Sequence, residues 1–299
     1  MSPLFRLHLL CFPPACRLCG RMMNPLGRAG PGFPFLCGPC RGKLPWIDPA
    51  HSCRACGALT AEPERERCPR CADKELLLDR VWCAFSYYEP LRRWLWNLKY
   101  YREETSATLL GALIEQAPNA GPALEEIQMV LPVPLHSRRL RGRGFNQAYL
   151  LAHAWLEAVR RQGRPVPPLH TGLLQRHRHT RPQLELGPKQ RATNVADAFS
   201  VNDAAACNAA VIPAASNIAA SDGAREAGGT AHGKEAGIES LQREATAAGA
   251  PVGEQGPLAG QRLLLVDDLM TSGATLAACA SALRQAGAAG VEALVLARA

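Results

Sequence analysis

The sequence predicts an α/β protein with a mostly parallel sheet, preceded by a cysteine-rich region. After residue 80, short apolar runs typical of strands alternate with stretches of helical periodicity. This alternation favours parallel strands covered by helices on both faces. Nine of the twelve cysteines fall before residue 81, and the chain is 47% hydrophobic and 20% charged, a balance that suits a packed core. We therefore predict two domains, residues 1–80 and 81–299.

The predicted strands and helices of the second domain follow from residue type and spacing. Runs of aromatic, β-branched and other apolar residues predict strands at 81–88, 129–134, 262–268 and 291–299. Apolar residues at three- and four-residue steps predict helices at 89–101, 106–117, 146–163 and 275–287. Asn146 stands where the third helix should begin, and its side chain suits an N-cap.

Residues 202–256 interrupt this pattern. The segment is rich in Ala, Gly and small polar residues, has no aromatic residue, and carries seven acids against three bases. Because it can bury too little apolar surface to offset its ordering entropy, we predict a disordered insertion within the second domain. A short helix over 235–250, which the alanine content permits, is the alternative.

Four CxxC pairs dominate the first domain. They are Cys16 and Cys19, Cys37 and Cys40, Cys53 and Cys56, and Cys68 and Cys71. Each pair presents two thiolates from a tight turn, and two pairs complete the tetrahedral shell that zinc prefers. The first two pairs are separated by 17 residues and the last two by 11, spacings that fit ribbon-type zinc sites.

The cysteine pairs predict zinc rather than disulfides or a redox centre. Structural disulfides are rare in the cytosol, and a redox CxxC normally occurs once, beside a βαβ unit. Sequential pairing gives two zinc ions, while interleaved pairing and a single ion with four spare cysteines stay open. Since protein ligands fill each shell, the sites should be structural. We expect Cys11, Cys83, Cys207 and Cys279 to be buried or incidental thiols.

Charge and hydropathy favour a protein with anionic partners and without a membrane span. The formal net charge is +8, and residues 135–195 alone carry 12 Lys and Arg against two acids. Such a surface favours nucleic acid, phosphorylated metabolites or an anionic membrane as partners. No apolar run approaches the ~18–20 residues of a membrane span. The opening residues lack a signal-peptide cleavage site, so we expect a cytoplasmic protein.

The clearest candidate site is the segment LLLVDDLMTSGATL at 263–276. A buried strand brings Asp267 and Asp268 to the carboxyl edge of the sheet, where ligands bind in open α/β folds. The loop that follows opens a helix, and the backbone N–H groups of such a loop form an anion site. The two acids would repel a phosphate but suit two sugar hydroxyls beside it. The segment therefore predicts a site for a ribose 5-phosphate.

The predicted ligands of the 5-phosphate are the backbone and hydroxyl groups of this loop. They belong to Thr271, Ser272, Gly273, Ala274 and Thr275. The hydroxyl groups can donate to phosphate oxygens, and the glycine lets the backbone approach the phosphate closely.

A group of arginines follows the predicted strand 129–134. Arg138, Arg139, Arg141 and Arg143 lie within six positions. Arginines this close repel one another unless an anion lies among them. The loop that carries them should face the same edge of the sheet as the two acids. Arg138, Arg139 and Arg143 are therefore candidate ligands for a pyrophosphate group or for a nucleic-acid backbone.

The segment 263–276 resembles the ligand-binding motif of type I phosphoribosyltransferases. This resemblance implies the type I phosphoribosyltransferase fold and the binding of phosphoribosyl pyrophosphate. Asp267 and Asp268 would hold the ribose 2- and 3-hydroxyls, and residues 271–275 the 5-phosphate. It also implies a Mg²⁺ ion that bridges ribose oxygens and pyrophosphate.

The chain as a whole resembles the ComF competence family over residues 16–201 and 257–299. The matching pieces are the cysteine pairs and the segments YEPLRRWLWNLKY, LPVPLHSRRLRGRGFNQAYLLA, RATNVADAF and LLLVDDLMTSGATL. The resemblance implies an N-terminal double zinc ribbon and a role in DNA uptake during natural transformation or in the use of DNA as a nutrient. The insertion 202–256 departs from the family's usual pattern.

Three functions stay open from the sequence. The first is a protein that binds phosphoribosyl pyrophosphate with Mg²⁺ and acts in DNA uptake, with single-stranded DNA and other uptake proteins as partners. The second is a non-catalytic single-stranded DNA-binding module that uses phosphoribosyl pyrophosphate as a regulatory ligand. The third is an active phosphoribosyltransferase of nucleotide metabolism. The sequence identifies neither an acceptor base nor a catalytic residue.

Aromatic residues are candidates for stacking on the bases of a nucleic-acid strand. They are Trp46, Trp82, Tyr87, Tyr88, Trp94 and Trp96. Packing in the core is the alternative use of most of them.

Overall fold

The computed structural model describes residues 15–23, 35–60, 66–72, 76–101, 104–117, 121–178, 197–202, 205 and 256–299. The predicted insertion 202–256 lies outside the described residues except at 202, 205 and 256, as do Cys11 and Cys207. The disorder of the insertion therefore stays a prediction, as does the domain boundary at residue 80. Within the described part of the chain, no helix has the length and apolar character to cross a bilayer.

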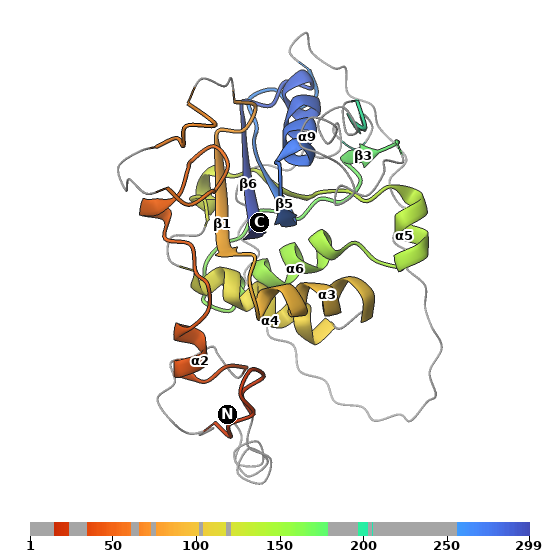
Figure 1. Ribbon diagram of the computed structural model, residues 1–299. Helices are drawn as coiled ribbons and strands as arrows, with labels where there is room; N and C mark the ends of the chain where they lie inside the picture. Colours follow the sequence, from red (N-terminus) through yellow and green to blue (C-terminus); the bar gives the residue numbers. More distant parts are fainter. Residues whose placement is uncertain are drawn as a thin grey trace, which may run out of the picture.

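A four-stranded parallel sheet forms the centre of the fold (Figure 1). Its strands are β1 (Arg80–Ser86), β2 (Met129–Pro132), β5 (Arg262–Met270) and β6 (Gly290–Arg298), in the order β1-β6-β5-β2. All three neighbouring pairs are parallel, which confirms the predicted α/β class. A separate antiparallel pair, β3 (Leu174–Arg176) and β4 (Phe199–Val201), was not predicted because each strand has only three residues.

The four predicted helices are present, with ends close to the predicted ones. They are α3 (Leu91–Tyr101), α4 (Glu104–Gln116), α6 (Gln147–Arg160) and α9 (Ala274–Gln285). Asn146 caps α6 as predicted, because its Oδ1 accepts a hydrogen bond from the Ala148 N–H at 3.0 Å. Shorter elements that the sequence patterns did not predict are α2 (Gly38–Gly42) and the 3-10 turns η1 (Pro49–His51) and η2 (Leu124–Glu126).

The arginine segment, expected as a loop, is instead the short helix α5 (Ser137–Arg143). His136 caps its start, since the ring Nδ1 accepts from the Arg138 N–H at 3.2 Å. Gly144 ends the helix with a φ of 81°, a left-handed conformation that suits a helix terminus. The helix gives the arginines two separate faces, which a flexible loop would not do.

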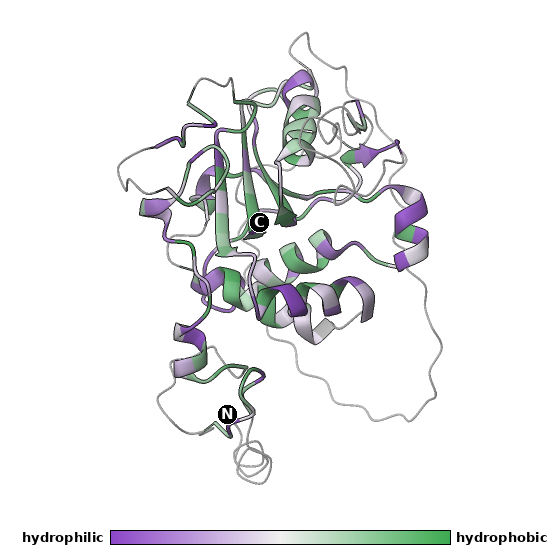
Figure 2. Cartoon of the chain, viewed as in Figure 1, coloured by the Kyte–Doolittle hydropathy of each residue, from purple (hydrophilic) through white to green (hydrophobic). Residues whose placement is uncertain are grey.

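The sheet separates two apolar layers (Figures 1 and 2). Successive residues of a strand point to opposite faces. Leu264 and Val266 of β5 accordingly pack with residues of α3, α4 and α6, whereas Leu263 and Leu265 pack with residues of α9. All four side chains are at most 1% exposed. This alternation decides on which face the residues at the end of β5 lie.

A close crossing of α4 and α6 supports one of these layers. Gly111 of α4 lies against Ala154 and Trp155 of α6. A Cβ atom at Gly111 would lie 2.6 Å from the carbonyl carbon and from the Cβ of Ala154. Because backbone atoms cannot turn aside as the end of a side chain can, the crossing requires glycine at this position. It thereby sets the position of α6 under the sheet.

The variant Gly111→Ala should lower the free energy of unfolding by about 1–3 kcal/mol, because the added methyl group forces two helices apart. Urea unfolding measures the loss. Gly42→Ala is the matched control, since a Cβ there would meet no atom within 4 Å, and its effect should stay within about 0.5 kcal/mol. Equal stability of the two variants would contradict the close crossing.

Candidate functional site

The two acids predicted for the site lie at the carboxyl edge of the sheet. The pairing of β2 with β5 ends at Val266, whereas β5 continues beside β6 to Met270. Asp267 and Asp268 occupy this extension. By the alternation of the strand, Asp268 lies on the face covered by α3 and α6, and Asp267 on the face of α9. The edge therefore presents one carboxyl group to each layer.

Asp268 is held by an ion pair and a hydrogen bond. Its side chain is 6% exposed, and its Oδ2 pairs with the Nζ of Lys99 in α3. Gln147, the first residue of α6, donates from Nε2 to Oδ1 at 3.4 Å. Burial alone would raise the pKa of Asp268, but the charge of Lys99 lowers it below its usual value. Asp268 is therefore an ionised carboxylate that ties β5 to two helices.

The pKa of Asp267 is shifted in the opposite direction from that of Asp268. Burial and the charge of Asp268 raise the pKa of Asp267 well above its usual value. Its Oδ1 accepts a hydrogen bond from the Asp268 N–H at 2.9 Å. A carboxyl group whose ionised form is disfavoured gains from a ligand that brings a hydroxyl donor or a cation to it. Asp267 is thus the member of the pair more open to a ligand.

Residues 271–273 join β5 to α9, and Ala274 and Thr275 are the first two residues of α9. Gly273 has a φ of 80°, in the left-handed region, and a Cβ there would lie 2.5 Å from Cε of Met270. Ser272 accepts a hydrogen bond at its Oγ from the Ala274 N–H at 3.4 Å. Because α9 begins at Ala274, the N–H groups of its first turn point toward this end of the helix, where they suit an anion.

The arginines of α5 divide between two faces of the helix. Arg139 and Arg143, four residues apart, are half-buried and line a pocket. Arg143 donates from Nη1 to Oε1 of Gln147 at 2.5 Å. Arg138 and Arg141 are exposed. Helical geometry thus separates two candidate anion ligands from the other two.

One pocket of about 620 Å³ brings many of these groups together. Its volume lies within the range of small-molecule sites. Of the residues predicted for the site, its lining includes Asp267, Asp268, Thr271, Thr275, Arg139 and Arg143. The pocket lies where the carboxyl ends of β2 and β5 meet α3, α5 and α6.

The pocket also contains residues outside the predicted sugar and phosphate site. Tyr87 and Trp96 were predicted only as candidates for stacking on bases. Sequence reasoning missed Lys99, Tyr100, Gln147 and Arg176. Only a weak sequence pattern pointed to Lys99: it is a cation that follows Leu95 and Leu98, two residues on the buried face of α3. Gln147 left no such signal, since polar residues are common in the first turn of any helix.

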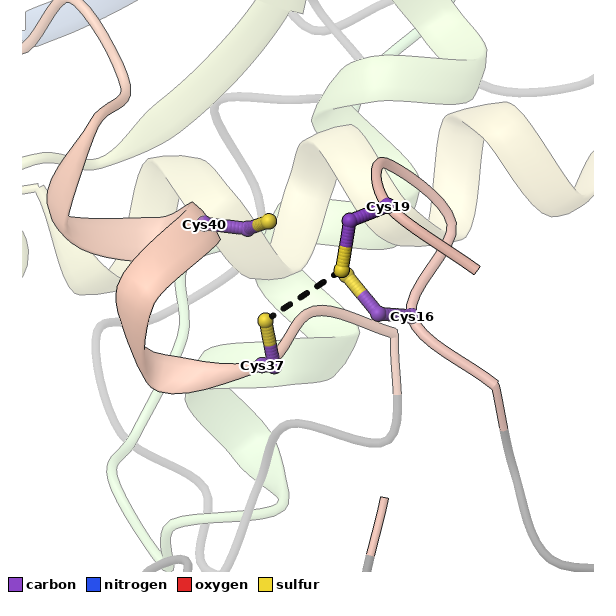
Figure 3. A group of neighbouring side chains, drawn as sticks. All are labelled: Cys16, Cys19, Cys37 and Cys40. Carbon is purple, nitrogen blue, oxygen red and sulfur yellow. Dashed lines mark hydrogen bonds between the residues drawn. The ribbon is translucent and has the colours of Figure 1, made fainter. Parts of the chain in front are cut away.

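The predicted zinc ligands form two tetrads in sequential pairing. Cys16, Cys19, Cys37 and Cys40 converge on one point (Figure 3), and Cys53, Cys56, Cys68 and Cys71 form the second group. Within each tetrad all sulfur atoms lie within 4.8 Å of one another. The described cysteines form no disulfide.

The spacing of the sulfur atoms fits zinc. A Zn–S bond of about 2.3 Å in tetrahedral geometry requires sulfur atoms about 3.8 Å apart. The sulfur atoms of Cys19 and Cys37 are 3.7 Å apart, and those of Cys56 and Cys68 are 3.8 Å apart. Two structural zinc ions therefore fit the residues present, as the sequential pairing predicted.

The first CxxC pair of each tetrad lies in the same kind of backbone turn. Gly20 donates its N–H to the carbonyl of Cys16 at 2.8 Å, and Gly57 donates to Cys53 at 2.7 Å. Both glycines have a positive φ, 71° and 62°. Each turn is closed by an antiparallel bridge, Ala15 with Met22 and Ser52 with Leu59. The first two cysteines of each tetrad are therefore held by the same backbone geometry.

The thiol groups of the first tetrad differ in acidity. Burial raises the pKa of Cys16, but backbone N–H groups of Cys37, Cys19 and Leu18 lower it to about 6. Hydrogen bonding with Cys37, together with burial, raises the pKa of Cys40 to about 12. Four thiolates repel one another at these distances, so a bound dication is what would allow all four to ionise.

Both cysteine-rich segments contact the part of the chain that follows residue 80. Arg298 of β6 donates from Nε to the carbonyl of Cys56 at 2.9 Å and from Nη1 to the carbonyl of Met270 at 3.2 Å. Arg41 of α2 donates to Oε1 of Gln116 in α4 at 3.0 Å. The second tetrad is therefore linked through one guanidinium group to the end of β5, where the loop 271–273 begins.

Purified protein should contain two zinc ions per chain, and Cys19→Ser or Cys68→Ser should each lower this number to one, because each removes one ligand of a different tetrad. Elemental analysis of the purified variants measures the ratio. Cys279→Ser, which changes a buried cysteine outside both tetrads, should still contain two. Fewer than one zinc per wild-type chain would contradict the two-site arrangement.

Lys99→Met should lower the free energy of unfolding at pH 7 by about 3 kcal/mol, because it leaves the buried carboxylate of Asp268 without its cation. The folded-state pKa of Asp268 is depressed. Its contribution is therefore complete above its unfolded pKa of about 4 and is lost as the pH falls through the folded value. In the variant, burial of Asp268 is no longer opposed by Lys99, so this carboxylate takes up a proton at a higher pH than in the wild type. The difference between the two proteins should therefore already be smaller at pH 4 than at pH 7.

Urea unfolding at pH 7 and at pH 4 measures this difference. Arg160→Met is the control, because it removes an ion pair with Glu157 in which the arginine is 58% exposed. Its cost should be below about 1 kcal/mol. A loss in Lys99→Met that matches the control, or that is independent of pH, would contradict the buried pair.

The chain is similar to two bacterial proteins. It is 28% identical over 188 residues to Competence protein F of Haemophilus influenzae, a match that covers 56% of this chain and 77% of that protein. It is 29% identical over 198 residues to DNA utilization protein YhgH of Salmonella typhimurium, covering 64% of this chain and 79% of that protein. No family model matches the chain. The chain is therefore similar to proteins named for competence and for DNA utilization, in keeping with the resemblance of its motifs to the ComF family.

Proposed function

We propose that the pocket binds phosphoribosyl pyrophosphate. The observation that carries the proposal is that one pocket contains two carboxyl groups, two threonines at the start of α9 and in the loop before it, and two arginines. A ribose with phosphate groups at two positions needs all three: acceptors for its hydroxyls, N–H and O–H donors for the 5-phosphate, and cations for the pyrophosphate. We assign these roles to Asp267 and Asp268, to residues 271–275, and to Arg139 and Arg143.

Mg²⁺ fits the same proposal. This ion is usually held by one or two carboxylates together with phosphate oxygens of the substrate. Asp267, whose ionised form is disfavoured by burial and by Asp268, is a carboxyl group that a nearby cation would ionise. A bound Mg²⁺ would neutralise charge on the pyrophosphate, and Arg139 and Arg143 would orient that group from α5.

The biological role in the proposal is DNA uptake. The names of the two relatives refer to competence and to DNA utilization. A cytoplasmic location agrees with a phosphorylated metabolite as ligand and with two tetrads of reduced thiols. Within this role we place the zinc ribbons of residues 1–80 as structural supports of a phosphoribosyltransferase-like domain, residues 81–299.

A second candidate function is favoured by the exposed face of α5. Arg138 and Arg141 lie on the face of α5 opposite the half-buried Arg139 and Arg143, and both are exposed. Two cations on a solvent-facing helix suit the backbone of single-stranded DNA. In this version phosphoribosyl pyrophosphate is a regulatory ligand and the protein performs no transfer. Release of pyrophosphate in the presence of a free base distinguishes turnover from regulation.

Asp267→Asn should weaken the binding of phosphoribosyl pyrophosphate about 10- to 100-fold, because hydrogen bonds to a charged group contribute roughly 1.5–3 kcal/mol. Calorimetric titration with Mg²⁺ present measures the affinity. Asp267 is a cleaner test than Asp268, whose change also breaks the ion pair with Lys99. Glu125→Gln removes one negative charge from an exposed residue and should leave the affinity unchanged. Unaltered affinity in Asp267→Asn would remove the ribose assignment.

A further inference from the structure

Two aromatic side chains at the pocket have no role in the function proposed above. Trp96 and Tyr100 of α3 line the pocket, yet they are 56% and 59% exposed. The same helix buries Trp94, Leu95 and Leu98, which are at most 6% exposed. One face of the helix therefore packs into the core, and two further rings face the pocket and solvent. Core packing, the alternative weighed for tryptophans in the sequence, does not account for Trp96.

The two rings form a paired aromatic surface. Their centroids are 4.4 Å apart and their planes are inclined by 40°. The guanidinium carbon of Arg143 lies 5.7 Å from the centroid of Tyr100, within the range of a cation–π contact. One side of the pair is thus bounded by a cation of α5.

A chain of contacts connects this surface to the carboxyl edge of the sheet. Lys99, between the two aromatic residues in sequence, pairs with Asp268. Arg143, beside Tyr100, donates to Gln147, and Gln147 donates to Asp268. Residues three or four apart on a helix have Cβ atoms about 5–6 Å apart. Trp96 therefore lies about one helical turn from Lys99, and Tyr100 follows Lys99 directly in sequence.

We propose that Trp96 and Tyr100 form a stacking subsite for a purine or pyrimidine ring at the mouth of the pocket. The inference rests on the proposed binding of a phosphoribosyl group and extends it, since it names the chemical class of the acceptor. A ligand that places its ribose at Asp267 and Asp268 would place a ring attached to that ribose within reach of the aromatic pair.

The occupant is a base of a small molecule rather than a peptide. Aromatic side chains with a free face bind flat heterocyclic rings by stacking, and every nucleobase offers such a face. The arginine at the border adds a donor and a cation that suit the oxygen and nitrogen atoms of a base. The volume of about 620 Å³ encloses groups for sugar, phosphate and ring in one cavity, which points to a nucleotide-sized ligand.

The experiment compares ribose 5-phosphate with the 5′-monophosphates of adenosine, guanosine, cytidine and uridine, each titrated into the full-length zinc-loaded protein. At least one nucleotide should bind about 5- to 100-fold more tightly than ribose 5-phosphate, because stacking on one aromatic residue has this effect on affinity. Trp96→Ala should remove most of that difference and leave the affinity for ribose 5-phosphate unchanged. Trp96→Phe should retain most of it.

Tyr101→Ala is the matched control, because Tyr101 is an exposed aromatic residue of the same helix that is absent from the pocket lining. It should alter neither affinity. Binding of ribose 5-phosphate with no gain for any nucleotide would overturn the stacking subsite and leave the proposed function intact. Binding of nucleotides that depends on Trp96, without binding of ribose 5-phosphate, would support the subsite and contradict the proposed function. Binding of neither class would overturn both.

A fifteen-nucleotide oligothymidine separates the small molecule from a strand of DNA. If Trp96→Ala weakened binding of the oligonucleotide at low and high salt but not that of any mononucleotide, the aromatic pair would be a DNA contact. That result would overturn the assignment to an acceptor base.

Discussion

The ion pair between Lys99 and Asp268 is the contact on which the geometry of the pocket depends. It joins the end of the central strand to α3, and the hydrogen bond from Gln147 adds α6 to the same carboxylate. Asp268 lies in a layer of otherwise apolar side chains, so a displaced partner leaves a charge that water cannot easily reach. The aromatic pair of α3 and the arginine that contacts Gln147 are thus connected to this one carboxylate through Lys99 and Gln147.

The site combines both layers of the fold. Because neighbouring residues of β5 face opposite sides, Asp268 belongs to the layer of α3 and α6, and Asp267 to that of α9. The loop before α9 adds its N–H groups to the second side, and α5 adds cations to the first. A ligand with several kinds of polar group would therefore contact elements that are distant in sequence.

The parts of the structure that depend on neighbouring residues could be predicted from the sequence. The strand, acid pair and loop at 263–276, the cap at Asn146 and the cysteine pairs all involve residues within a few positions, and ribbon spacing suggested the sequential tetrads. Lys99 and Gln147 could not be predicted, because their role follows from how α3 and α6 pack against β5. The helical form of the arginine segment was missed because Gly142 and four like charges disfavour a helix. Helical periodicity distinguishes Trp94 from Trp96, but it does not distinguish a pocket from open solvent.

Arg298 connects the second cysteine tetrad to the central sheet. One planar guanidinium group contacts the carbonyl of Cys56 and the carbonyl of Met270, using two nitrogen atoms at fixed separation. A lysine has a single terminal nitrogen and could not span the two acceptors in this way. The rigid fork of one side chain thus acts as a spacer. The separation between the carbonyls of Cys56 and Met270 is therefore fixed by the covalent geometry of the guanidinium group, and it does not depend on the length of the connecting loops.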